Sequence, residues 1–249
     1  KESFKDTELV DAHKIIMRSR ISKDENEIES IQQAINISEL SLNNCINQIN
    51  LGISETEIKN LLIQEMYKNG AEDMPFSPLV LISHNSSLPH GHSQHKNKLK
   101  HQDALLIDFG CSVNGYNSDI TRTYFFHDIK KEHEKIYNAV LKANEIGLEI
   151  LKPGITMHEI DDRVLNSLAK SGYEKLIVHK TGHGLGLDVH ENPYIMRKNY
   201  EKLESGMVLT IEPGLYNYGE LGVRIEDDVL ITDKGYNCLT SLPKDIQII

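Results

Sequence analysis

The sequence contains no run of apolar residues that approaches the ~20 needed to cross a bilayer, which excludes an integral membrane protein. Basic residues are also in deficit, since 27 Lys and Arg stand against 37 Asp and Glu, for a net charge of −10. A surface of this sign repels the phosphates of nucleic acids. We therefore expect neither a nucleic-acid nor a membrane partner, and no segment near the N-terminus resembles an export signal.

Cysteine is scarce, and Cys45, Cys111 and Cys238 are far apart with no C-x-x-C pair among them. This spacing excludes a structural zinc site built from cysteine pairs, and it indicates reduced, buried thiols in a cytoplasmic protein. The remaining composition, with 39% hydrophobic and 26% charged residues in 249, is typical of a globular chain with a sizeable core.

The first half of the chain reads as two helices followed by strands. Apolar residues recur every three or four positions over 24–49, and a capping box opens a second helix over 54–69. Residues 79–83 and 104–109 are rich in strand-forming side chains. An Asn-Gly pair within 113–126 predicts a hairpin turn that leads into another strand.

The same order of elements then repeats. Helices are expected over 136–150 and over 156–172, and the last third of the chain is β-rich. We therefore predict an α+β domain of two related halves over 21–249. Residues 1–20 show no clear period and are expected to form a lead-in from a preceding domain.

Four carboxylates and one imidazole stand at or within the predicted strands: Asp108, Asp119, Glu212, Glu226 and His183. Any one of them alone more often caps a turn or lies at the surface. Several buried carboxylates in one β-rich core, however, need cations to offset their charge. An oxygen-rich set with one nitrogen donor suits a pair of divalent ions such as Mn, Co, Fe or Zn.

The motifs around these residues resemble those of the pita-bread metallopeptidases, a family that includes methionine aminopeptidase, prolidase, aminopeptidase P and creatinase. The resemblance covers about residues 20–240 and rests on four motifs in order: DFGCSVNGYNSDITRT, TGHGLGLDVHENP, TIEPGLY and GVRIEDD. It implies the pita-bread fold of two pseudo-symmetric αβ halves. It also implies that the five residues above bind two divalent ions, with manganese expected and cobalt, zinc or iron as alternatives.

Creatinase works without the metals and lacks the full ligand set, so the intact set favours a metallopeptidase. His90 stands in a Pro-His-Gly context that resembles the Xaa-Pro-cleaving members, whereas methionine aminopeptidases tend to have Cys-His-Gly. The positions of His179, His190, Tyr216 and Arg224 relative to the ligands also resemble prolidase and aminopeptidase P.

The resemblance implies a role for each of these residues. Glu212, His190 and His90 are expected to be catalytic, with Glu212 also a metal ligand. His179, Arg224 and Tyr216 are expected to bind substrate. From the residues alone, His90 would be a solvated loop histidine, and Arg224 could simply pair with Glu226. Neighbouring histidines are expected to remain in solvent: His84, His92, His95 and His101.

The sequence thus predicts a dinuclear-metal peptidase that hydrolyses the Xaa-Pro bond of short proline-containing peptides, in an enzyme that can form a homodimer. One alternative is methionine aminopeptidase, which is also naturally short. Another is a non-catalytic adaptor built on the same fold, but a pure scaffold has no physical need for clustered carboxylates.

Overall fold

The computed structural model describes residues 10–249. The helices are α1 (His13–Ile21), α2 (Glu25–Ile46), α3 (Glu55–Lys68), α4 (Lys131–Glu149) and α5 (Met157–Leu168). Within the described chain, no helix combines the length and the apolarity that crossing a membrane requires. The strands of the first half are β1 (Leu79–Ile82), β2 (Ala104–Phe109), β3 (Ser112–Val113), β4 (Tyr116–Asn117) and β5 (Ile120–Phe125).

The strands of the second half are β6 (Gly182–Gly184), β7 (Glu191–Ile195), β8 (Val208–Ile211), β9 (Gly214–Asn217), β10 (Leu221–Arg224), β11 (Asp227–Thr232), β12 (Gly235–Cys238) and β13 (Gln247–Ile248). The chain therefore places a helix pair before a group of strands in each half, as the sequence predicts.

The four-stranded sheet of the first half has the order β1-β2-β5-β13, with β13 added from the end of the chain, and it is covered by α2 and α3. Each of these helices begins at a capping box, in which Asp24 pairs with Glu27 and Ser54 with Glu57. Their apolar stripes bury against the inner faces of β1 and β2, which makes one continuous core.

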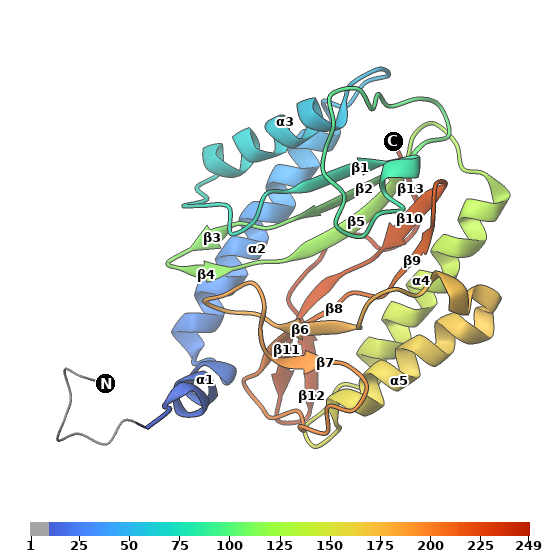
Figure 1. The fold of residues 1–249 in the computed structure, drawn as a ribbon. Coiled ribbons are helices and arrows are strands. Elements are labelled where there is room, and N and C mark those ends of the chain that lie inside the picture. Colours follow the sequence, from blue (N-terminus) through green and yellow to red (C-terminus); the bar gives the residue numbers. More distant parts are fainter. Residues whose placement is uncertain (1–9) are drawn as a thin grey trace, which may run out of the picture.

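The second half is a five-stranded sheet in the order β12-β11-β8-β6-β7, and α4 and α5 pack on it and on the β9–β10 hairpin. In Figure 1 the helix pairs lie at two sides of the molecule with the strands between them. The halves meet where the backbone N–H of Glu226 donates to the carbonyl oxygen of Thr121 at 3.1 Å. The five-residue set predicted from the sequence lies at this junction.

Most predicted elements are confirmed, and the main differences concern α1 and the ends of the helices, including α4, which begins at Lys131 rather than near residue 136. The hairpin turn is found at Asn114 and Gly115, which have φ values of 51° and 79°. Helix α1, however, lies within the stretch that shows no clear period, and residues 1–9 of that stretch lie outside the described part of the chain. The first long helix ends at Ile46 rather than near residue 49, and α5 ends at Leu168 before a wider helical turn that reaches residue 173.

Candidate metal centre

Five side chains from both halves converge on one point. They supply one ligand atom each in overlapping groups of three, and within each group the ligand atoms lie no more than 4.8 Å from one another. The groups are Asp108 with Asp119 and Glu226, His183 with Glu212 and Glu226, and Asp119 with His183 and His190. All five predicted ligands are thus brought together, and His190 joins them.

The first two carboxylates come from neighbouring antiparallel strands. Asp108 lies in β2 opposite Thr121, and Asp119 immediately precedes β5. The two backbone segments approach so closely at Gly110 that a Cβ there would lie 1.9 Å from the carbonyl oxygen of Ser118. Only glycine fits at such a contact. Asp108 and Asp119 thus lie close to each other at the junction of the halves.

The other three predicted ligands come from the second half. His183 lies in the middle of the short strand β6, and Glu212 follows the end of β8. The backbone N–H of Glu212 donates to the carbonyl oxygen of Thr181 at 2.8 Å, which holds the two side chains next to each other. Glu226 was expected within a strand, but it lies in the link between β10 and β11, where the chain passes from the hairpin to the five-stranded sheet.

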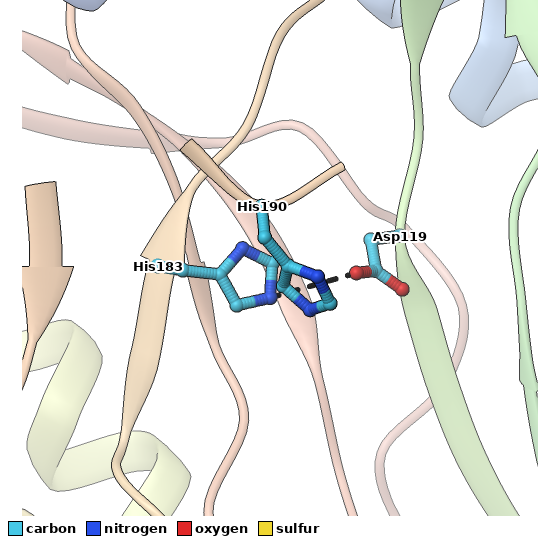
Figure 2. A group of neighbouring side chains, drawn as sticks. All are labelled: Asp119, His183 and His190. Carbon is cyan, nitrogen blue, oxygen red and sulfur yellow. Dashed lines mark ion pairs between the residues drawn. The ribbon is translucent and has the colours of Figure 1, made fainter. Parts of the chain in front are cut away.

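The imidazole of His183 is oriented for ligation. Its Nδ1 lies 3.1 Å from the carbonyl oxygen of Gly184, so Nδ1 carries the proton and Nε2 keeps its lone pair. Nε2 lies 3.4 Å from Oε1 of Glu212 and 3.6 Å from Oδ2 of Asp119. Figure 2 shows this contact with Asp119, and the ring of His190 lies against that of His183 with centroids 4.2 Å apart.

The centre holds more negative charge than its own cations offset. Burial, followed by the neighbouring carboxylates, raises the pKa of Asp119 and of Glu226 well above the ordinary value. Burial also raises the pKa of Glu212 to about 7, and it lowers that of His183 to about 3. Each shift reflects the cost of holding a charge out of water next to like charges.

Among the side chains of this centre, one buried acceptor has no partner within the described residues. Oδ1 of Asp108 is buried and has no hydrogen-bond donor within the described residues. An orphaned carboxylate oxygen among three further carboxylates and an imidazole lone pair fits divalent cations, which these donors bind in proteins. These residues could therefore hold metal ions.

Three of the residues predicted to bind substrate form a buried network. Nη1 of Arg224 donates to the hydroxyl of Tyr216 at 2.6 Å, and this hydroxyl lies 2.8 Å from Nε2 of His179. Because Nδ1 of His179 donates to the carbonyl oxygen of Lys180 at 2.8 Å, Nε2 accepts the proton of Tyr216. The guanidinium of Arg224 also pairs with Asp108 rather than with a glutamate. Arg224 thus links this network to a predicted ligand.

A cavity of about 380 Å³ opens over the five ligands. His90 lines it, together with His179, His190 and Arg224. Sequence reasoning missed other members of the wall: Phe76, Leu79, His92, Lys180 and Val189. His92 remains exposed, as expected, but the loop after β1 also places it at the wall of the cavity. The only signal for it was its place two residues after His90.

The chain matches the sequence profile of metallopeptidase family M24 over residues 29–233. It is 38% identical over 242 residues to a putative dipeptidase, YkvY, of Bacillus subtilis, an alignment that covers 97% of this chain and 66% of that protein. The chain therefore spans about two thirds of the length of this curated relative.

Solved structures show the same relationship. The X-Pro aminopeptidase of Thermotoga maritima superposes with a TM-score of 0.96 and 37% identity, over 100% of this chain and 70% of that one. The prolidase of Pyrococcus furiosus superposes with a TM-score of 0.90 and 38% identity, over 92% and 68%. These similarities confirm the predicted pita-bread fold. The chain belongs to metallopeptidase family M24.

Proposed function

We propose that the chain is the catalytic part of a dinuclear-metal peptidase that hydrolyses the Xaa-Pro bond of short peptides. The observation that carries the proposal is the convergence of five metal-type ligands beneath one cavity, with an orphaned oxygen on Asp108. The structural neighbours named X-Pro aminopeptidase and prolidase support the choice of bond.

Two divalent ions would be held by the five residues of the set: Asp108, Asp119, His183, Glu212 and Glu226. When bound, such ions activate water and polarise a carbonyl at neutral pH. Manganese is the expected metal, although the donor set also suits cobalt, zinc or iron.

Glu212 would move the proton. Its side chain remains 15% exposed, compared with 7% for that of Asp119, so one of its oxygens can face a water molecule in the cavity. It would accept a proton from the attacking water and deliver it to the nitrogen of proline as the peptide bond breaks. Water thus contributes a hydroxyl to the new carboxylate and a proton to the new amine.

The histidines would bind and orient the substrate. His190 would donate a hydrogen bond to the carbonyl oxygen of the scissile bond, where negative charge develops. His90 and His179 would contact the proline, whose fixed φ gives the substrate one rigid shape. Tyr216 and Arg224 would hold His179 and Asp108 in place through the hydrogen bonds described above.

Cellular context is part of the same proposal. Cys45, Cys111 and Cys238 are all free thiols, and the first two are buried, which supports a reducing, cytoplasmic setting. We also propose that short proline-containing peptides are the partners and that the enzyme acts as a homodimer.

The proposal is tested with metal-stripped protein and added Mn²⁺ on three substrates: Ala-Pro, a longer Ala-Pro-X peptide and Met-Ala-X. Release of proline from Ala-Pro alone identifies a dipeptidase, and cleavage of the longer peptide identifies an aminopeptidase. Cleavage of Met-Ala-X alone would replace the proposal with methionine aminopeptidase. No metal-dependent cleavage, together with fewer than two bound ions per chain, would favour the adaptor.

A further inference from the structure

One buried carboxylate outside the metal centre holds the loop that lines the cavity. Glu55 is the first residue of α3 and is fully buried. Its hydrogen-bond partners within the described residues are all neutral. Oε1 accepts from the backbone N–H of Ile82 at 2.6 Å, and Oε2 accepts from that of Gln94 at 2.7 Å. The side-chain amides of Asn85 and Asn97 complete the shell.

These donors bracket the loop that carries the cavity histidines. Asn85 lies at the start of the loop and Gln94 near its end, so one carboxylate holds both ends together. The amide of Asn85 also donates to the carbonyl oxygen of His92 at 3.0 Å. Between these attachment points lie His90 and His92, which both line the cavity.

A buried charge among neutral donors costs free energy that a neutral side chain would not cost. Two features offset that cost here: the hydrogen bonds, and the N-terminus of α3, where a negative charge is favoured. A carboxylate can accept hydrogen bonds at both of its oxygen atoms. The amide of a glutamine would turn its NH₂ group towards one of the two sets of donors. The charge therefore matches the geometry of the loop.

We propose that Glu55 is a positioning residue, which acts through the loop to hold His90 and His92 against the bound peptide. This inference rests on the proposed function, since the loop wall is useful only if the cavity binds substrate. It predicts that Glu55→Gln loosens the loop and weakens catalysis while the five metal ligands, which lie on other elements, keep their places.

Glu39 provides a matched control. It is also a nearly buried carboxylate on a helix and also accepts from neutral groups, the N–H and hydroxyl of Ser241 and the N–H of Leu242. It does not line the cavity. Glu39→Gln should therefore cost stability in the same way without a specific effect on the histidine loop.

The first measurement is amide hydrogen exchange on metal-free protein. We expect exchange at Ile82 and Gln94 to be at least about tenfold faster in Glu55→Gln and unchanged in Glu39→Gln, since native-state exchange reports local opening. Equal exchange at these amides in Glu55→Gln and wild type would overturn the inference. This readout does not depend on activity, so it stands even if no Xaa-Pro peptide is cleaved, an outcome that would overturn the proposed function alone.

The second measurement is a double-mutant cycle with His90→Ala on Ala-Pro and Ala-Pro-X. Glu55→Gln should lower kcat/KM about tenfold or more, because misplaced binding groups are costly. Added to His90→Ala it should lower kcat/KM little further, since both changes affect one interaction. If the losses in kcat/KM from Glu55→Gln and His90→Ala were fully additive, or if Glu39→Gln lost as much, Glu55 would have only a general structural role and the inference would be overturned. If Glu55→Gln cannot be produced as folded protein, Asn85→Ala removes a hydrogen-bond donor from the loop instead. The same faster exchange and the same non-additive loss with His90→Ala are then expected.

Discussion

The hydroxyl of Tyr216 accepts a hydrogen bond from Nη1 of Arg224 at 2.6 Å and donates to His179 at 2.8 Å. Tyr216→Phe should leave Nη1 of Arg224 buried without a partner, which costs about 1–3 kcal/mol at most sites, and it also removes the donor to the partly exposed His179. We therefore expect a loss of stability in urea unfolding, together with a lower kcat/KM because Arg224 also contacts Asp108.

A conservative control lies on the same hairpin. Tyr218 is 84% exposed, so Tyr218→Phe should change neither the midpoint of unfolding nor the turnover. If the two variants were indistinguishable, the hydrogen bonds of Tyr216 would contribute nothing measurable.

Glu212→Gln should abolish most turnover while the fold is retained. Proton transfer by a positioned carboxylate typically contributes about 10²–10⁴ in rate, and an amide cannot accept the proton. The measurement is kcat on Ala-Pro, with circular dichroism to check the fold and bound metal determined separately. Glu201→Gln, at an exposed position, serves as the control. Near-normal activity of Glu212→Gln with metal bound would refute its role as the base.

Divalent metal should raise the melting temperature of the stripped protein. Ligand binding to the folded state stabilises by about 2.7 kcal/mol at a free concentration of 100 Kd. Calorimetric titration with Mn²⁺ should give two ions per chain, and Asp119→Asn should lose at least one of them. Asp233→Asn, at an exposed carboxylate, should bind as the wild type does. Unchanged stoichiometry in Asp119→Asn would remove that residue from the ligand set.

His133 should contribute stability that is lost as the pH drops below about 6.5, the ordinary pKa of an unperturbed histidine. His133 is buried on α4 against Phe125, and neither ring nitrogen has a hydrogen-bond partner within residues 10–249. Burial, and then Lys130, lower its pKa, although Glu220 lies 3.6 Å away and opposes this. The folded state then binds fewer protons than the unfolded state, so acid favours unfolding in this range.

The measurement is urea unfolding at several pH values between 5 and 8. Between about pH 7 and pH 5, the free energy of unfolding of His133→Phe should lose less than that of the wild type, because the substitution removes the titrating group. His84→Phe, at an exposed position, should leave the slope as it is. An unchanged slope in His133→Phe would assign the pH dependence to other groups.

The convergence of the candidate ligands could be predicted because each of their motifs, which resemble those of the family, joins a strand pattern to a carboxylate or an imidazole. Asp108 and Glu212 do stand where a strand pattern stops, and the Asn-Gly turn fixes the hairpin between β3 and β4. Glu226 was placed wrongly within a strand because the apolar alternation continues through Ile225. The break there depends on which sheet each strand joins, and local pattern carries no information about that.

The wall of the cavity could not be predicted in the same way. His92 lies in a polar loop whose path is set by contacts with Glu55, a residue 37 positions away in the sequence. Helix α1 was missed because its apolar residues are exposed: Ile15 is 75% and Ile16 57% accessible, so no core stripe marks it.

The position of the centre at the junction of the halves has a consequence for how the chain matures. Asp108 and Asp119 are made early, but His183, Glu212 and Glu226 belong to segments that are synthesised much later. Neither group alone supplies the full set of donors, so a partly synthesised or half-folded chain cannot assemble the proposed hydrolytic site. Metal uptake would then follow completion of the fold, and the nascent peptidase would stay inert beside other growing chains.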